Sequence, residues 1–213
     1  MQTHFSLLDK VIIGLQGALD TCIPKDKAPS MPNPANDTEE ITLTTKEKRE
    51  IIGLMRVNHA GEVAAQGLYI GQAMTARTQD LAGQMREAAN EEVDHLIWCQ
   101  QRLAELGSVP SRLSLLWYLG ALAIGTGAGL VGDKWNLGFL METEYQVMSH
   151  LQSHQQRLPK QDHKSQKIVQ QMLEDEAKHA HHAKLAGAAE LPSPLKKLMR
   201  LSAKVMTGTA YYF

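Results

Sequence analysis

The chain has few cysteines, few aromatic residues and almost no net charge. Cys22 and Cys99 are the only cysteines among 213 residues, which argues against a disulfide framework, excludes an all-thiolate metal site and is typical of a reducing compartment. Aromatic residues make up 5% of the sequence, while alanine, leucine, glutamine and glutamate are common, which favours helix over sheet. The net charge of −1 gives no reason to expect binding to nucleic acid.

No targeting segment is expected at the amino terminus. Asp9 and Lys10 interrupt the only apolar stretch at the amino terminus, so neither a signal peptide nor an arginine-rich transit peptide is expected. A cytoplasmic protein of bacterial type is the expectation that follows. The length suits one large domain with its own core better than two domains.

Proline is concentrated near the amino terminus and divides the chain. Residues 4–20 place apolar side chains at helical spacing and predict a short amphipathic helix that lies on the rest of the protein or on a neighbouring surface. The stretch 23–41 is expected to be an extended linker, because four prolines forbid a continuous helix: Pro24, Pro29, Pro32 and Pro34. We therefore predict an N-terminal helix and proline-rich linker over 1–41 and one helical domain over 42–213.

Apolar periodicity predicts the helices of that domain. Thr44 and Glu47 form a capping-box pattern in front of a long helix that continues through 51–77. Further helices are expected over 80–106, 134–157, 161–186 and 193–205, with glycine or proline marking several of the ends. An uncharged segment, 113–132, lies between the second and third of the long helices.

Two short motifs in these helices point to metal chemistry. A glutamate followed three residues later by a histidine occurs twice, and in a helix each pair presents a carboxylate and an imidazole on one face. An isolated glutamate lies 30 residues before the first pair and another lies 32 residues before the second, each on a different predicted helix. The candidate metal ligands are Glu62, Glu92, His95, Glu144, Glu176 and His179. One glutamate from each of two helices and one such pair from each of two others is the ligand set of ferritin-like di-metal proteins, so the sequence predicts an all-α, ferritin-like four-helix bundle with additional membrane-facing and terminal helices.

Glu62 is selected by the scarcity of acids around it. It is the only carboxylate between Ile51 and Arg77, whereas a solvent-facing helix normally carries several acids. The alternative is a buried glutamate that pairs with Arg56 or His59 without any metal.

Helix phase separates the other candidates from their acidic neighbours. Glu144 lies inside an apolar stripe of its helix, while Glu142 lies across from that stripe. Glu91 and Asp94 fall beside the stripe that contains the first glutamate–histidine pair. We expect Glu91, Asp94 and Glu142 to be solvated and to lie outside the site.

Four glutamates and two histidines suit a pair of ferrous ions. Two metal ions about 3.5–4 Å apart need several anionic oxygen ligands to offset their charge. Four negative charges balance two divalent ions, and six ligands leave coordination positions open for dioxygen. A catalytic zinc site needs one metal and three protein ligands, so this set over-supplies it. Four buried carboxylates without a metal would repel one another, which disfavours a bare bundle.

The uncharged segment 113–132 is long enough to cross a membrane. A single crossing there would place Glu62 and Glu92 on one side of the bilayer and Glu144 and Glu176 on the other, so we expect the segment to lie against the bundle and face the lipid interface. Its five glycines predict a poor continuous helix. The basic segment 193–205 either contacts lipid or, as we prefer, covers an ordinary buried apolar stripe with solvated lysines.

The run Arg56-Val57-Asn58-His59-Ala60-Gly61-Glu62, followed by Tyr69, resembles the first iron motif of the demethoxyubiquinone hydroxylase family of ubiquinone biosynthesis. The resemblance continues through the other candidate ligands and covers nearly everything from residue 42 to the C-terminus. It implies a carboxylate-bridged di-iron monooxygenase with two iron ions and dioxygen as co-substrate, bound peripherally at the cytoplasmic face of the cell membrane. The implied substrate is a 2-polyprenyl-3-methyl-6-methoxy-1,4-benzoquinol, and the implied catalytic residue that assists near the iron is His150.

Two other kinds of protein fit the same ligands or the same helices. An iron-oxidising or peroxide-scavenging ferritin-like protein would use the same six residues but would not need the uncharged segment. A non-catalytic helical interaction module would bind no iron. The electron donor is left open between a separate reductase, a nicotinamide and the quinol itself, and so is the choice between a homo-oligomer and a biosynthetic complex.

Overall fold

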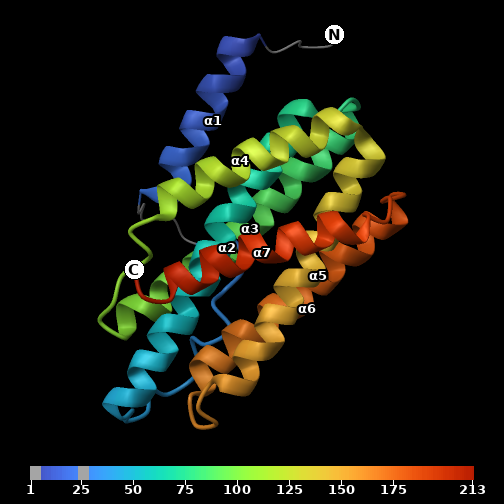
Figure 1. The fold of residues 1–213 in the computed structure, drawn as a ribbon. Helices are drawn as coiled ribbons and strands as arrows, with labels where there is room; N and C mark the ends of the chain where they lie inside the picture. The colour runs from blue at the N-terminus through green and yellow to red at the C-terminus, as the bar shows by residue number, and fades with distance from the viewer. Residues whose placement is uncertain (1–5, 24–28) are drawn as a thin grey trace.

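The computed structural model describes residues 6–23 and 29–213, and within these ranges the protein contains helices and no strand. The prediction of an all-α protein is therefore confirmed (Figure 1). The helices are α1 (Leu7–Cys22), α2 (Thr45–Thr75), α3 (Gln79–Glu105), α4 (Ser114–Val131), α5 (Asp133–Arg157), α6 (His163–Leu185) and α7 (Ser193–Ala210). The predicted capping box opens α2, because the Thr44 side chain accepts from the Glu47 backbone N–H and the Glu47 carboxylate accepts from Thr44.

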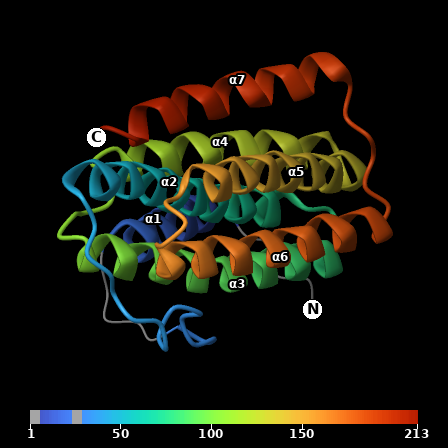
Figure 2. The ribbon, with the colours of Figure 1, turned by 90° about the horizontal axis from the view of Figure 1, so that it is seen from below.

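Four of these helices form the bundle. Helix α2 packs along α3, α5 packs along α6, and α3 also contacts α6. Figure 2 shows α2 and α5 in one layer, α3 and α6 in the layer beneath it, and α7 outside the bundle. Figure 1 shows that α7 crosses the bundle. Each bundle helix has an apolar cluster toward either end, one around Met55 and Trp98 and the other around Tyr69 and Met85. The candidate ligands lie between these clusters along every helix.

Helix α4 runs along α2, as expected for a segment that lies against the bundle. The prediction that its glycines would interrupt the helix is wrong. It is one continuous helix from Ser114 to Val131. A Cβ at Gly125 would overlap the Leu68 carbonyl oxygen, and a Cβ at Gly67 would overlap the Tyr118 carbonyl oxygen. The glycines therefore let the two backbones approach closely, and this contact offsets their low helix propensity.

The proline-rich segment is bound to the bundle where the structure describes it. Asp94 on α3 accepts hydrogen bonds from the backbone N–H groups of Ser30 (2.7 Å) and Met31 (2.8 Å). Asp94 is 3% exposed, so the expectation that it is solvated is wrong. Asp94 is buried because the linker covers that side of α3, which the phase of the helix does not indicate. Pro24 lies outside the described residues.

Helices α1 and α7 lie on the surface of the bundle. Helix α1 contacts α2 and α4 and leaves Leu8, Ile12 and several neighbours exposed. Helix α7 extends five residues beyond its expected end, and the expected buried stripe is absent: Leu198 and Leu201 are 58% and 60% exposed. The segment is helical as predicted, but α7 crosses the bundle and does not pack along a neighbouring helix, so much of its apolar side stays uncovered.

Candidate metal centre

The six candidate ligands meet in the middle of the bundle. Helices α2 and α5 contribute one glutamate each, and α3 and α6 contribute one glutamate and one histidine each. Their ligand atoms form two overlapping groups in which all atoms lie within 4.8 Å of one another. The first group is Glu62, Glu92, His95 and Glu176, and the second is Glu144, Glu176 and His179. Five of the six side chains are at most 3% exposed, and His179 is 9% exposed.

Glu92 and Glu176 each reach both histidines. Glu92 places Oε2 2.7 Å from Nδ1 of His95 and Oε1 3.0 Å from Nδ1 of His179. Glu176 places its two oxygens 3.6 Å and 3.4 Å from the same two nitrogens. These two carboxylates therefore have the arrangement of bridging ligands, while Glu62 and Glu144 lie at opposite ends of the cluster.

The unpartnered atoms of this cluster fit metal ions. Both oxygens of Glu92, Oε2 of Glu176 and Nδ1 of both histidines are buried and have no hydrogen-bond partner of acceptable geometry, although they lie so close together. Buried polar atoms normally have such partners, and those that lack one need an explanation. Carboxylate and imidazole lone pairs that converge without hydrogen bonding are the donor set that divalent iron accepts.

The charges of the metal-free cluster also favour a cation. Burial raises the pKa of Glu62 and Glu144 well above the ordinary value, and the carboxylates of Glu92 and Glu176 raise it further. Burial also acts on Glu92, but the neighbouring His95 and His179 outweigh it and hold the pKa of Glu92 well below the usual range. Without metal, protons thus compensate the negative charge, and bound cations would displace them.

Each histidine is held from its far side by a carboxylate of the opposite helix. Nε2 of His95 lies 3.3 Å from Oδ2 of Asp175, and Nε2 of His179 lies 2.6 Å from Oε2 of Glu91. Burial opposes a charged His179, yet its carboxylate neighbours raise the pKa of His179 to about 12. Such partners fix the ring orientation and leave Nδ1 facing the cluster.

The sequence reasoning missed these two partners. Glu91 is exposed, as expected, with 56% of its side chain accessible, but it is bonded to a candidate ligand. Asp175 has no histidine three residues after it, so the glutamate–histidine pattern does not select it. A signal was present, since each acid directly precedes the glutamate of a glutamate–histidine pair.

Glu142 and Arg56 lie near the site but contact other parts of the protein. Glu142 is 8% exposed, so the expectation that it is solvated is wrong: α7 covers it, and Lys196 places Nζ 3.3 Å from its Oε2. Arg56 donates to the carbonyl of Val109 and to Ser108, so it is not the partner of Glu62.

Two further residues of the first motif lie in the bundle core. His59 is buried, and burial lowers the pKa of His59 to about 4. Tyr69 donates a hydrogen bond to Oε1 of Glu144. This bond ties α2 to the candidate ligand of α5.

An apolar cavity of about 290 Å³ reaches the cluster from the side covered by α4 and α7. Glu62 belongs both to the cavity wall and to the ligand cluster. His150, half-buried on α5, also lines the cavity, and burial lowers the pKa of His150. Most other wall residues are apolar, among them Leu68, Ile124, Phe139, Leu151, Leu195 and Met199.

Comparisons with known proteins give one family and one fold. The model of the family described as "Ubiquinone biosynthesis protein COQ7" matches residues 49–210. A "3-demethoxyubiquinol 3-hydroxylase" of Chromobacterium violaceum is 53% identical over 206 residues, covering 96% of this chain and 99% of that protein. A protein of the same name from Nitrosococcus oceani is 51% identical over 209 residues, covering 98% of each. A dodecameric thioferritin from Bacteroides fragilis matches in structure with a TM-score of 0.52 over 73% of this chain and 89% of that chain; at 17% identity it shows the ferritin-like fold alone.

Proposed function

The chain belongs to the ubiquinone biosynthesis protein COQ7 family, and we propose that it hydroxylates the ring of a demethoxyubiquinol with dioxygen. The near-full-length likeness to 3-demethoxyubiquinol 3-hydroxylases supports this activity over iron storage or peroxide scavenging. The structural observation that carries the proposal is that Glu62 is shared by the ligand cluster and the apolar cavity. An apolar aromatic substrate in this cavity would lie directly beside the candidate metal ligands.

The cluster would hold two iron ions. Glu62, Glu92, His95 and Glu176 would hold one ion, and Glu144, Glu176 and His179 would hold the other. Iron bound there supplies the activation of dioxygen for oxygen transfer to the ring. Asp175 and Glu91 keep the histidine rings oriented, so the protein provides a preformed site.

The reaction balances with one external pair of electrons. One atom of dioxygen is inserted into a ring C–H bond and forms the hydroxyl group. The other atom leaves as water after uptake of two electrons and two protons. The donor of these electrons is a separate reductase, a nicotinamide or the quinol.

The cavity would bind the benzoquinol head group and exclude water. Its walls come from α2, α4, α5 and α7, and their apolar side chains suit an aromatic ring and the start of a polyprenyl tail. His150, on α5, lines the same space. We assign to it a catalytic role as a neutral proton donor or acceptor beside the ring, because its lowered pKa keeps it uncharged at neutral pH.

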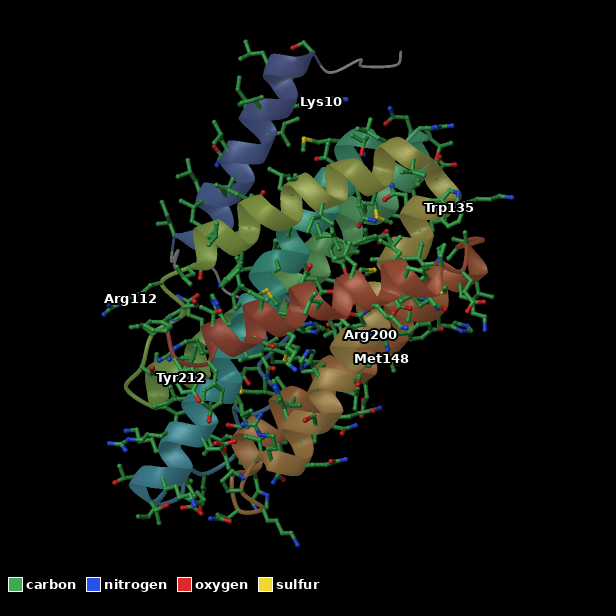
Figure 3. All side chains as sticks on the ribbon, viewed as in Figure 1. Lys10, Arg112, Trp135, Met148, Arg200 and Tyr212 are labelled. Atoms are coloured by element: carbon green, nitrogen blue, oxygen red, sulfur yellow. The ribbon has the colours of Figure 1, made fainter. Side chains whose placement is uncertain are left out.

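The substrate would enter from a lipid surface. Helix α4 is 18 residues long with a mean hydropathy of 1.5, so its length and composition would allow it to cross a bilayer, which by itself is weak support for membrane contact. Only 22% of it is buried, and exposed Arg112 and Trp135 lie beyond its two ends (Figure 3). Because α4 also packs along α2, it would lie in the plane of the cytoplasmic face of the cell membrane as a peripheral element.

The test is turnover of a short-chain demethoxyubiquinol by purified, iron-loaded protein with a chemical reductant. We expect the hydroxylated quinol as product and two iron ions per chain. Alanine replacement of any of the six candidate ligands should abolish turnover, while Glu174→Ala, on the exposed side of α6, should retain it. Iron-dependent peroxide removal without ring hydroxylation would overturn the proposal.

A further inference from the structure

Asn58 lines the apolar cavity one helical turn before Glu62. The two residues are spaced i and i+4 on α2, which places their Cβ atoms roughly 5–6 Å apart on one face. Asn58 is only 5% exposed, so its amide is a buried polar group in a largely apolar wall. Such a group needs hydrogen-bond partners.

One end of the Asn58 amide is committed to another helix. Nδ1 of His154 on α5 lies 2.6 Å from Oδ1 of Asn58, and His154 is 3% exposed. Burial, together with the nearby positive charge of Arg157, lowers the pKa of His154 to about 4. His154 is therefore neutral at pH 7, and its Nδ1–H donates to Oδ1, which fixes the orientation of the amide.

The other end of the amide has no strong acceptor among the described residues. Nδ2 of Asn58 lies 3.9 Å from the Met55 sulfur, and a thioether is a weak acceptor. A primary amide carries two N–H donors, and Met55 can accept from only one of them. At least one N–H of this cavity-lining residue therefore has no protein acceptor.

Other polar side chains of the cavity already have protein partners. Thr143 donates to the carbonyl of Phe139, and Gln146 donates to Glu142 and to the carbonyl of Lys196. On the α2 side of the cavity, next to the ligand cluster, Asn58 is therefore the donor best placed to bind a ligand oxygen.

We propose that Asn58 binds a ring hydroxyl oxygen of the quinol and thereby selects which ring carbon faces the metal ligands, with His154 as the residue that positions its amide. This inference rests on the proposed function. In a 3-demethoxyubiquinol, carbon 3 is bonded to a carbon that bears one of the two hydroxyl groups of the quinol. Carbon 3 is two bonds away from that oxygen, so a ring held by this oxygen at Asn58 would present carbon 3 to Glu62, one helical turn further along the wall.

The chemistry explains why an amide is fixed by a second residue. A freely rotating amide presents either an acceptor or a donor, whereas the bond from His154 leaves only the donor toward the ring. Discrimination between ring positions then depends on one hydrogen bond. A site built for a hydroxyl group loses this bond completely when another ring substituent lies in its place.

The experiment compares two inhibitors in the iron-loaded full chain. One is a redox-stable short-chain analogue that keeps the oxygen next to carbon 3, and the other has hydrogen in its place. Wild type should bind the first at least about tenfold more tightly. In Asn58→Leu this ratio should fall to about threefold or less, while iron content and the thermal melt stay close to wild type. Should Asn58→Leu not give folded protein, Asn58→Ala makes the same test.

His154 is tested by a pair of variants. His154→Leu should lower the inhibitor ratio and lower kcat/KM for the quinol, because the amide is no longer oriented. His154→Gln keeps a donor for Oδ1 and should restore most of both values. The exposed α5 variant Gln152→Leu should match wild type.

The outcomes separate this inference from the proposed function. An unchanged inhibitor ratio in Asn58→Leu would overturn the binding role of Asn58, and equal behaviour of His154→Leu and wild type would overturn the positioning role. Failure of wild type to hydroxylate any quinol would instead count against the proposed function, because the inhibitor ratio is measured without turnover.

Discussion

Glu91 Oε2 lies 2.6 Å from Nε2 of His179, so the residue next to one candidate ligand on α3 holds another candidate ligand on α6. Asp175 mirrors this relation, since it precedes Glu176 on α6 and contacts Nε2 of His95 on α3. The two contacts cross between the helices in opposite directions. They make each glutamate–histidine pair dependent on the helix that carries the other pair.

Removal of either crossing carboxylate should weaken metal binding. Asp175→Asn and Glu91→Gln keep the size of the side chain but lose the charge that orients and polarises the histidine. We expect metal affinity to fall about 10–100-fold, measured by titrating metal-free protein against a competing chelator. Glu174→Gln, next to Asp175 but exposed, is the control. Affinities equal to wild type in both variants would show that the contacts have no role at the metal.

Without metal, the stability of the protein should fall as pH rises. Glu62 and Glu144 have pKa values above the ordinary 4.5 in the folded state, so above that pH the unfolded chain loses these protons first and unfolding becomes easier. His179 acts in the same direction: its pKa of about 12 adds stability below its ordinary pKa of 6.5 that is lost as pH rises further. Below pH 6.5 the buried His59 and His154 act in the opposite direction, because their pKa values are lowered to about 4. The melting temperature of metal-free protein should therefore decline above about pH 6.5.

Metal and neutral variants supply the controls for this pH dependence. Ferrous iron or manganese should raise the melting temperature, because it binds only the folded state. The double variant Glu62→Gln, Glu144→Gln should show a flatter decline and a more stable metal-free protein. A metal-free melt that is independent of pH and of added metal would contradict the gathering of these carboxylates in one core.

Two glycines of α4 should respond in opposite ways to alanine. A Cβ at Gly125 would meet the backbone of Leu68, so Gly125→Ala should cost about 1–3 kcal/mol through separation of α2 and α4. A Cβ at Gly127 meets nothing within 4 Å, so Gly127→Ala should stabilise the helix by roughly 0.5–1 kcal/mol. Thermal melts of the two variants check the prediction, and equal shifts would mean that α4 does not pack as described.

Asp94→Ala should destabilise the protein without removing its metal. The change leaves the N–H groups of Ser30 and Met31 without their acceptor, at a cost of about 1–3 kcal/mol for each group that stays buried. Denaturant unfolding measures the loss, and the metal content should equal that of wild type. Glu87→Ala on the exposed side of α3 should change stability by no more than about 0.5 kcal/mol. A stable Asp94→Ala protein would show that the linker is not held there.

Charged residues on α4 and α7 should weaken binding to lipid vesicles. Leu116 and Leu201 are 58% and 60% exposed, and burying a leucine in an apolar phase contributes about 1.5–3 kcal/mol. Leu116→Glu with Leu201→Glu should therefore lower the partition coefficient by at least about tenfold in a flotation assay. Leu185→Glu, at a position that is 72% exposed at the end of α6, should leave the partition coefficient unchanged. Equal losses in both proteins would indicate that no particular face contacts lipid.

The sequence by itself determined the helices and the set of candidate ligands. Spacing of three residues places Glu92 with His95 on one helical face whatever the rest of the chain does, and the same local rule applies to the second pair. The capping box at Thr44 is equally local, and it opens α2 as expected. Glu144 could be selected because an apolar stripe identifies the buried side of its helix, and Glu62 because no other acid lies between Ile51 and Arg77.

Only the tertiary structure decided which other polar residues are buried and what they contact. Asp94 and Glu142 lie beside an apolar stripe or across from it, yet the linker covers one and α7 covers the other. Segments distant in sequence determine their exposure, and helix phase carries no information about those segments. The same reason applies to the partner of His95, to the continuous glycine-rich α4 and to the pairing of Asn58 with His154: each depends on the distance between two helices, which local spacing does not define.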